Sequence, residues 1–224
     1  MTPLERTDLV GWHLEGGADP TDRLERAVAA ARAGRPVVHP TETVYGVGSG
    51  LGEAGVRAVC AAKRRSDQKP ILALVEGVDA VPELEWTDEA RELARLFWPG
   101  AVTLVLGDPR ATFPAGVRSA GGTVAIRHSP HPIASALVRA LGGPLTSSSA
   151  NRPGEPPATD SEAAARFARD LLDDGIGAPH LIDAGALPPA PPSTLVDCTT
   201  PEPRVLREGA VPVTRLRCVL PRIS

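Results

Sequence analysis

The chain has 224 residues, 42% of them hydrophobic, which is enough apolar content for a globular core in one domain or two small ones. Its formal net charge of −3 argues against a protein that coats nucleic acid, because such proteins usually carry an excess of Lys and Arg. The three cysteines are widely spaced and form no C-x-x-C pair, so they fit reduced thiols better than a disulfide framework or a zinc site.

Alternating helix and strand patterns run through the first half of the chain. Apolar residues at helical spacing predict a helix over 21–33, ended by Gly34. A β-prone run at 36–39 precedes a turn-rich stretch at 40–50, a helix at 53–64 and a buried strand at 71–75. A helix at 88–97 is expected to begin on Thr87 as N-cap and to end before Pro99. Two β-prone runs follow, at 102–106 and 123–126.

The second half repeats this alternation. We expect a helix at 132–141, a strand at 144–148, and a helix at 160–173 that opens on the capping box Thr159-x-x-Glu162. Short strands are expected near 180–183, 194–197 and 204–206, and a last one through 211–219. The alternation indicates an α/β sheet domain. The expected boundaries are an N-terminal extension at 1–15, one domain at 16–215 and a C-terminal tail at 216–224.

A basic run, KRRSDQK at 63–69, has two interpretations. It lies where a helix is expected to end, and cations at a helix C-terminus are favoured by the helix dipole, so it could be a solvated helix end. It could also be an anion site, since Arg presents a planar fork to phosphate oxygens and Lys adds a compact charge. A strand edge in an α/β protein is a common place for such a site.

Two further segments are rich in hydrogen-bonding side chains. The strand at 144–148 runs into three serines, an alanine and an asparagine, which suit a polar ligand pocket, although on this segment alone an ordinary turn is favoured. The segment HPTETVYG at 39–46 places four polar side chains on one loop, and threonines that merely cap turns explain it as well. The chain has no G-x-x-x-x-G-K-[ST] loop, G-x-G-x-x-G fingerprint, G-x-S-x-G elbow or H-E-x-x-H motif.

Taken together, seven segments resemble the motifs of the YrdC/TsaC-type threonylcarbamoyl-AMP synthase family. They occur in the family's order over about residues 34–210, and this order reduces the weight of the separate alternatives above. The segments are PTETVYG at 40–46, KRR at 63–65, WPGAVT at 98–103, VAIR at 124–127, SAN at 149–151, STLVD at 193–197 and LREG at 206–209.

The resemblance implies a single YrdC-like α/β domain, whose twisted mixed sheet and flanking helices surround a basic cavity. It also implies a reaction that joins L-threonine, bicarbonate or CO2, and ATP into threonylcarbamoyl-AMP and pyrophosphate. The product would feed the threonylcarbamoyladenosine modification of tRNA. The threonine amine becomes a carbamate, whose oxygen attacks the α-phosphorus of ATP. Because that nucleophile is already anionic, neutralisation and positioning are the main requirements.

Correspondence with the family's motifs assigns the expected site residues. Lys63 and Arg65 would be catalytic, while Thr41, Arg127 and Ser193 would bind threonine. We expect the basic run and the Ser-Ala-Asn segment to form opposite walls of one cavity. The ATP-binding set would be Lys63, Arg65, Lys69, Thr123, Ser147, Ser149, Asn151 and Arg207.

The expected cofactor is Mg2+ bound with ATP, without a metal site made by the protein. A lid over the cavity is expected from the loop at 152–157 or from the C-terminal tail, since the mixed anhydride hydrolyses readily. Separate tRNA threonylcarbamoyl-transfer proteins would act downstream, and a direct contact with tRNA is left open. We expect a cytoplasmic protein without membrane contact, because the chain has no run of roughly eighteen apolar residues.

The chain departs from the family pattern at three places. Arg64 stands where glycine is more common, Ser66 stands where proline is usual, and the spacing over 128–132 is one residue longer. Two alternatives remain. One is a YrdC-like protein that binds double-stranded RNA or tRNA without synthase activity, against which the net charge and the few aromatic residues count. The other is an enzyme that makes carbamoyl-AMP from carbamoyl phosphate, although such domains usually belong to much longer chains.

Overall fold

A computed structural model describes residues 3–10, 20–64 and 70–224 of the chain. Helices and strands alternate along most of it. In chain order the elements are β1 (Glu5–Asp8), η2 (Pro20–Leu24), α1 (Glu25–Arg32), β2 (Val37–Pro40), β3 (Tyr45–Gly48), α2 (Glu53–Ala62), β4 (Leu72–Leu74), η3 (Val78–Ala80), α3 (Asp88–Phe97), β5 (Val102–Gly107), β6 (Thr123–Arg127), α4 (Pro132–Leu141), β7 (Leu145–Ser149), α5 (Ser161–Asp173), β8 (His180–Asp183), β9 (Thr194–Asp197), β10 (Arg204–Arg207) and α6 (Val213–Arg217).

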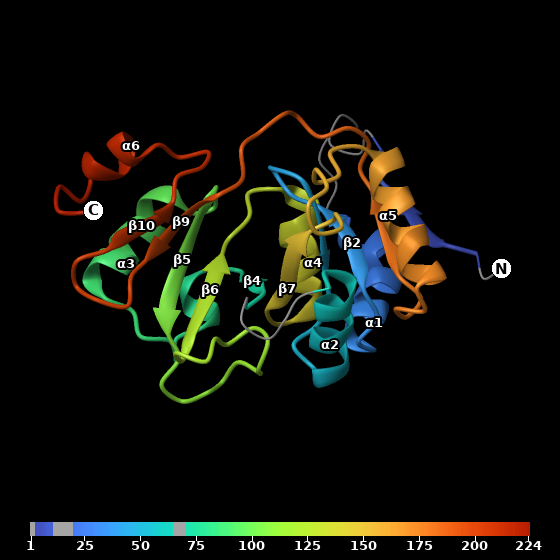
Figure 1. Ribbon diagram of the computed structural model, residues 1–224, viewed down its shortest axis with the longest axis horizontal. Coiled ribbons are helices and arrows are strands. Elements are labelled where there is room, and N and C mark those ends of the chain that lie inside the picture. The colour runs from blue at the N-terminus through green and yellow to red at the C-terminus, as the bar shows by residue number, and fades with distance from the viewer. Residues whose placement is uncertain (1–2, 11–19, 65–69) are drawn as a thin grey trace.

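Across the described residues, the strands form one mixed sheet of ten in the order β1-β8-β2-β3-β7-β4-β6-β5-β9-β10. Near its middle, β7 pairs antiparallel with β3 on one side and with β4 on the other. Helices α1, α2, α4 and α5 gather around the half that contains β2, whereas α3 and α6 lie with β5, β9 and β10 (Figure 1). The predicted α/β fold, with a mixed sheet and flanking helices, is confirmed.

Two helices, α3 and α4, have the bounds that the sequence predicts. The Thr87 side chain accepts a hydrogen bond from the Ala90 amide at 3.1 Å, which caps α3 as expected. The α4 helix begins on Pro132, whose fixed φ suits a first helical turn. It ends before Gly142, whose φ of 74° is the left-handed conformation that suits glycine at this position.

Two local predictions are wrong. The N-cap of α5 is Asp160, whose carboxylate accepts from the Ala163 amide at 2.8 Å, so Thr159 is not the cap. The strand predicted through 211–219 is instead the short helix α6. The alternation of apolar residues breaks there, since Val213 and Leu216 are three residues apart, a helical spacing, and Pro212 is the N-cap residue.

The stretch at 40–50, predicted to be turn-rich, contains β3, a completely buried strand. Its glycines misled the prediction, because glycine weakens an isolated strand. A Cβ on Gly46 would come within 3.0 Å of the His39 ring and 2.9 Å of the Ser147 hydroxyl. Glycine is therefore required here by the close approach of neighbouring side chains.

Both terminal segments contact the sheet. Strand β1 pairs in parallel with β8, and the Val205 amide of β10 donates to the Ser224 carbonyl at 2.7 Å. The domain boundaries drawn at 15/16 and 215/216 stay predictions. None of the described helices is long and apolar enough to cross a membrane.

Candidate functional site

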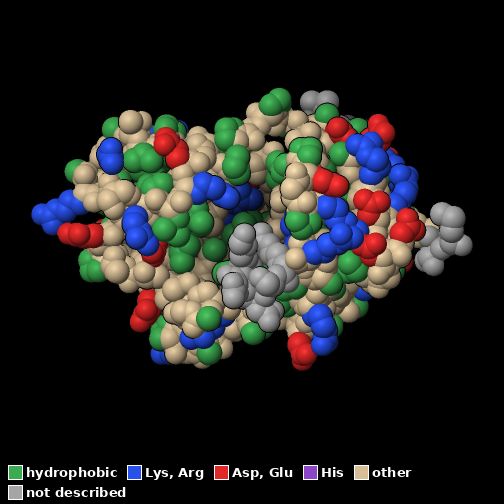
Figure 2. All heavy atoms as spheres, viewed as in Figure 1, with side chains coloured by type: hydrophobic (Ala, Val, Ile, Leu, Met, Phe, Trp, Pro, Cys, Tyr) green, Lys and Arg blue, Asp and Glu red, His purple; other side chains and the backbone are tan. Residues whose placement is uncertain are grey.

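A cavity of about 810 Å3 lies beside the C-terminal end of β7, a strand near the middle of the sheet. In Figure 2 a hollow near the middle of the face has Lys or Arg side chains at its depth. The described lining contains two arginines and no acidic side chain, together with hydroxyl and apolar groups. It consists of Thr41, Thr43, Val44, Gly46, Pro70, Leu72, Thr103, Ala125, Arg127, Ser147, Ser148, Ser149, Pro156, Pro157, Thr159, Ala190, Pro192, Ser193, Leu195 and Arg207.

One side of the cavity, which we call the arginine wall, is formed by Arg127 of β6 and Arg207 of β10. Arg127 is only 4% exposed, and its Nη1 lies 3.0 Å from Oε1 of Glu42. The other Glu42 oxygen accepts from the Ser129 hydroxyl at 2.6 Å. Burial lowers the pKa of Arg127, and Glu42 opposes that shift. Glu42, which the sequence did not single out as a site residue, thus holds Arg127 in place.

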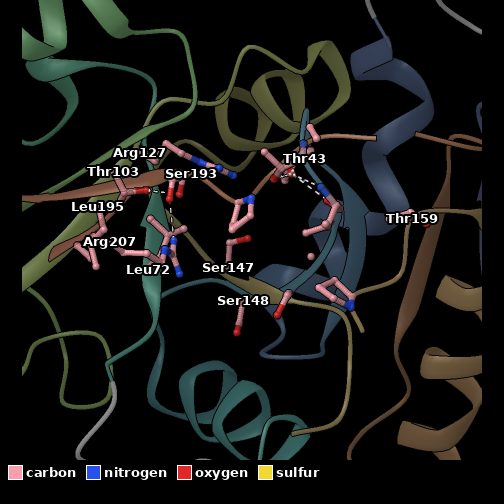
Figure 3. A pocket seen from close by; sticks show the side chains of 18 of the residues that line it. Thr43, Leu72, Thr103, Arg127, Ser147, Ser148, Thr159, Ser193, Leu195 and Arg207 are labelled. Atoms are coloured by element: carbon pink, nitrogen blue, oxygen red, sulfur yellow. Dashed lines mark hydrogen bonds between the residues drawn. The ribbon is translucent and has the colours of Figure 1, made fainter. Parts of the chain in front are cut away.

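Arg207 belongs to a second group on the arginine wall. Its Nη2 donates to the Ser193 carbonyl at 2.8 Å, and the Ser193 hydroxyl shares a hydrogen bond of 2.8 Å with Thr103 Oγ1 (Figure 3). The structure therefore brings together Ser193 and Arg207, which were predicted to contact different substrates. Thr103 was missed as a site residue, although it is the threonine of the WPGAVT segment and its position there was the available signal.

Thr41 lies on the loop between β2 and β3 and is 2% exposed. Its hydroxyl donates to the Val44 carbonyl at 2.8 Å and contacts Thr43 Oγ1 at 3.0 Å. The same oxygen accepts from the Thr43 and Val44 amides, each at 3.3 Å, so the hydroxyl is held within the turn. Thr41 and Arg127 line the same cavity, as predicted.

The opposite side, which we call the serine wall, is formed by Ser147, Ser148 and Ser149 of β7. Figure 3 shows Ser147 and Ser148 on a different side of the cavity from Arg127 and Arg207. Ser147 contacts the ring of His39, a buried residue of β2 that the sequence did not single out, at 3.4 Å. Burial, assisted by the charge of Arg127, lowers the pKa of His39 to about 4.

Lys63 lies on the same side as the Ser-Ala-Asn segment, so the prediction of opposite walls is wrong. Its ammonium contacts the Ser149 carbonyl at 2.6 Å, and the carbonyl and side-chain oxygens of Asn151 at 2.5 Å and 2.7 Å. The α2 helix ends directly at Lys63, which turns this side chain toward the end of β7. Neither Lys63 nor Asn151 is among the residues that line the cavity.

Arg64 has a φ of 46°, the left-handed conformation that follows many helix C-termini. This explains why glycine is common at the middle of the K-x-R motif. Arg64 lies 3.6 Å from Asp174, which also pairs with Arg152. Arg65, Ser66 and Lys69 lie outside the described residues, so their predicted roles stay predictions, as does the positive character of the cavity.

Thr123 is not among the lining residues. It lies on the same face of β6 as Ala125 and Arg127, because side chains alternate along a strand, but at the far end. Its hydroxyl shares a hydrogen bond of 2.8 Å with Ser119. The ATP contact predicted for Thr123 stays a prediction.

Among the described residues, no three His, Cys, Asp or Glu side chains are placed to hold a metal ion together. Magnesium usually keeps several waters and binds substrate phosphates rather than an all-protein cage. The magnesium ion expected with ATP stays a prediction. Pro156 and Pro157 border the cavity, which agrees with the position expected of a lid at 152–157.

The comparisons with known proteins agree with this geometry. The family model for Sua5, YciO and YrdC, described as "Telomere recombination", matches residues 29–209. A Mycobacterium tuberculosis protein provisionally named a threonylcarbamoyl-AMP synthase is 40% identical over 91% of this chain and 93% of its own length. The threonylcarbamoyl-AMP synthase of Bacillus subtilis is 32% identical over 88% of this chain and 56% of its own.

Among solved structures, that of Pyrococcus abyssi Sua5 complexed with L-threonine matches with a TM-score of 0.85 and 28% identity. The match covers all of this chain and 63% of that one, so the chain spans somewhat less than two thirds of this relative. The motifs, the fold and the matches agree, and the chain belongs to the Sua5/YciO/YrdC family.

Proposed function

We propose that this chain is a threonylcarbamoyl-AMP synthase, which makes threonylcarbamoyl-AMP and pyrophosphate from L-threonine, bicarbonate or CO2, and ATP. The observation that carries the proposal is the meeting of Arg127, Thr41 and Ser193 with the serine wall in one cavity. A cavity of about 810 Å3 falls within the usual range for small-molecule sites. The threonine complex of the Pyrococcus abyssi relative and the names of the curated relatives support the same reaction.

In this proposal threonine binds at the arginine wall. The Arg127 guanidinium uses one Nη for Glu42, while its Nε has no hydrogen-bond partner among the described residues. A planar fork with an uncommitted edge is suited to a carboxylate. Thr41 and Ser193, both nearly buried, would hold the remaining polar groups of the amino acid.

The triphosphate of Mg-ATP would lie between Arg207 and the turn that follows β7. The carbamate formed on threonine is the nucleophile and carries its own negative charge, so the site needs cations and fixed donors rather than a Ser–His pair. Its oxygen forms a bond to the α-phosphorus, and the bond from that phosphorus to the bridging oxygen of pyrophosphate breaks. Magnesium, bound to the phosphates, would neutralise charge on the leaving group.

Lys63 has two roles in this proposal. Its ammonium already holds the turn at 149–151, and it would also contribute positive charge close to the nucleotide. Arg65 and Lys69 are assigned to the phosphates from the family motif alone. Downstream threonylcarbamoyl transfer to tRNA by partner proteins belongs to the same proposal. So does a cytoplasmic location, the compartment of the ATP and tRNA on which this pathway depends.

The decisive test is incubation of the protein with ATP, bicarbonate and a panel of amino acids, followed by measurement of pyrophosphate and of the adenylate product. We expect pyrophosphate release to require threonine, and serine tests whether the threonine methyl group is needed. An Arg204→Ala variant is the matched control, since this arginine is on β10 but does not line the cavity. Release that is indifferent to threonine would contradict the proposal. Salt-sensitive RNA binding without ATP turnover would favour the RNA-binding alternative instead.

A further inference from the structure

Two hydrogen bonds determine where His39 carries its proton. The ring is fully buried in β2, its Nδ1 lies 3.3 Å from the Pro40 carbonyl, and its Nε2 lies 3.4 Å from Ser147 Oγ. A carbonyl oxygen can only accept, so Nδ1 carries the hydrogen. In a neutral imidazole the other nitrogen is then an acceptor. The reverse tautomer would face two lone pairs toward each other in a buried environment, which is unfavourable.

The surroundings of His39 keep the ring neutral and in place. Burial and the nearby positive charge of Arg127 both lower its pKa. The ring packs against the backbone of β3, where a Cβ on Gly46 would lie 3.0 Å from both Cε1 and Nε2. His39 pairs directly with Gly46 in the sheet, so its ring lies against the backbone of the partner strand and beside Ser147.

The direction of the hydrogen bond at Ser147 follows from this tautomer. Because Nε2 accepts, the Ser147 hydroxyl must donate, and its oxygen lone pairs remain for the cavity that it lines. Ser149 differs, since its hydroxyl donates to Asn151 Oδ1 at 2.5 Å within the turn. Neighbouring serines of one strand are therefore committed to different partners.

We propose that His39 is a positioning residue that fixes Ser147 as a hydrogen-bond acceptor for the N–H of threonine and of its carbamate. The inference rests on the proposed function. A phosphate oxygen carries no hydrogen to donate, so an acceptor-only Ser147 disfavours the phosphate groups of ATP. Ser147 and Arg127 line the same cavity, so this acceptor and the proposed carboxylate site belong to one pocket. Ser147 would thus serve threonine rather than the phosphates of ATP, a revision of the ATP contact expected from the sequence.

The tautomer can be tested without substrate. Nitrogen NMR of protein labelled at histidine, at pH 7, should show His39 with a protonated Nδ1 and an unprotonated Nε2. The signal is assigned by its loss in a His39→Gln variant. A protonated Nε2 would overturn the inference, whatever the enzyme's activity.

Kinetics test the consequence for threonine. Replacing His39 with Leu removes the acceptor for the Ser147 hydroxyl. We expect the KM for threonine to rise about tenfold, which corresponds to the loss of roughly one hydrogen bond, while the KM for ATP stays unchanged. His39→Gln, whose side-chain oxygen can still accept from Ser147, should restore most of the loss. In a Ser147→Ala background the His39→Leu change should add nothing, as expected for residues that act through one another.

His180 offers a matched control, because it is a second buried histidine whose Nε2 contacts a hydroxyl, that of Thr7, at 2.8 Å, but outside the cavity. His180→Leu should lower stability and leave both KM values unchanged. An effect of His39→Leu on the ATP KM alone, or an equal effect with and without Ser147, would overturn the inference. Absence of threonine-dependent turnover in the wild-type protein would instead contradict the proposed function, with the NMR result still standing on its own.

Discussion

The arginine wall and the serine wall place their charges in different ways. On the arginine wall, Arg127 and Arg207 each contact an acceptor of the protein and still have N–H groups to offer. Beside the serine wall, the Lys63 ammonium meets four oxygens of the 149–151 turn, three of them within 2.7 Å. An arginine has five N–H donors on a rigid fork, whereas a lysine has three on one atom. An arginine can therefore donate to the protein and still keep N–H groups for a ligand, while a lysine that donates to several protein oxygens has none left.

This comparison teaches that a cation in a binding motif need not be available to the ligand. The arginine wall presents charge to the cavity, whereas on the serine wall the hydroxyl groups of Ser147 and Ser149 are directed from behind by His39, Lys63 and Asn151. Five predictions test this division.

The largest effect is expected behind the serine wall, at His39. Its pKa of about 4 in the folded protein lies below the ordinary value of 6.5, so the unfolded chain binds the proton more readily. Stability should fall as the pH drops from about 6.5 to about 4, and His39 should account for about 3 kcal/mol of that loss. Urea unfolding of wild type and His39→Leu across this range should show the difference. His128 and His180 are present in both proteins, so any difference in the pH dependence of stability is due to His39. If stability falls equally with pH in the two proteins, the prediction for His39 is wrong.

On the arginine wall, Arg127→Gln should lower kcat/KM for threonine about 100-fold, because a charged hydrogen bond to the carboxylate is lost. Glu42 would then be buried without its partner, so part of the effect could reflect misfolding. The Glu42→Gln/Arg127→Gln double variant removes that charge and serves as the control for stability. Threonine kinetics that are unaffected in a folded Arg127→Gln protein would remove this residue from the threonine site.

Lys63→Met should destabilise the protein by about 2 kcal/mol, because partly buried oxygens of the turn lose their donor. It should also abolish turnover, and Arg65→Ala should do the same. The control is Arg64→Met, which removes an exposed cation one residue further along the chain. This variant should change the free energy of unfolding by less than about 0.5 kcal/mol. Denaturant unfolding measures both. Equal stability of the two variants would show that the lysine contributes charge only.

Arg207→Ala should raise the KM for ATP about tenfold, by loss of one charged contact. The effect should weaken with added salt, since Arg207 is exposed at the cavity rim. Arg204→Ala, on the same strand but paired with Asp197 outside the cavity, should leave the KM unchanged. The pair is compared at low and high ionic strength, and similar behaviour of both variants would remove Arg207 from the site.

The smallest effect is expected at Arg64. Replacement by glycine should stabilise the protein by about 0.5–1 kcal/mol, since its φ of 46° is costly for a residue with a Cβ. The exposed contact with Asp174 at 3.6 Å that is lost should matter little. Thermal unfolding measures the change. A destabilised Arg64→Gly protein would mean that the ion pair outweighs the backbone strain.

Several elements followed from the sequence because their causes are local. A threonine that caps its own helix, as Thr87 does, acts within a few residues of itself. The collinear motifs also located most of the cavity lining, including Thr41, Arg127 and Ser193. Such residues are identifiable because their types suit the ligand, whatever their neighbours in space.

Other features depend on contacts between distant segments, and only the tertiary structure decided them. Strand β3 has the composition of a turn, and it is a strand because its glycines admit His39 and Ser147 at short range. The motif order could not say that Lys63 would hold the Ser-Ala-Asn turn, since 86 residues separate Lys63 from Ser149. The sequence by itself determined which chemical groups the site contains. Packing determined which of their donors and acceptors remain for a ligand, because each buried polar group must first find a partner within the protein.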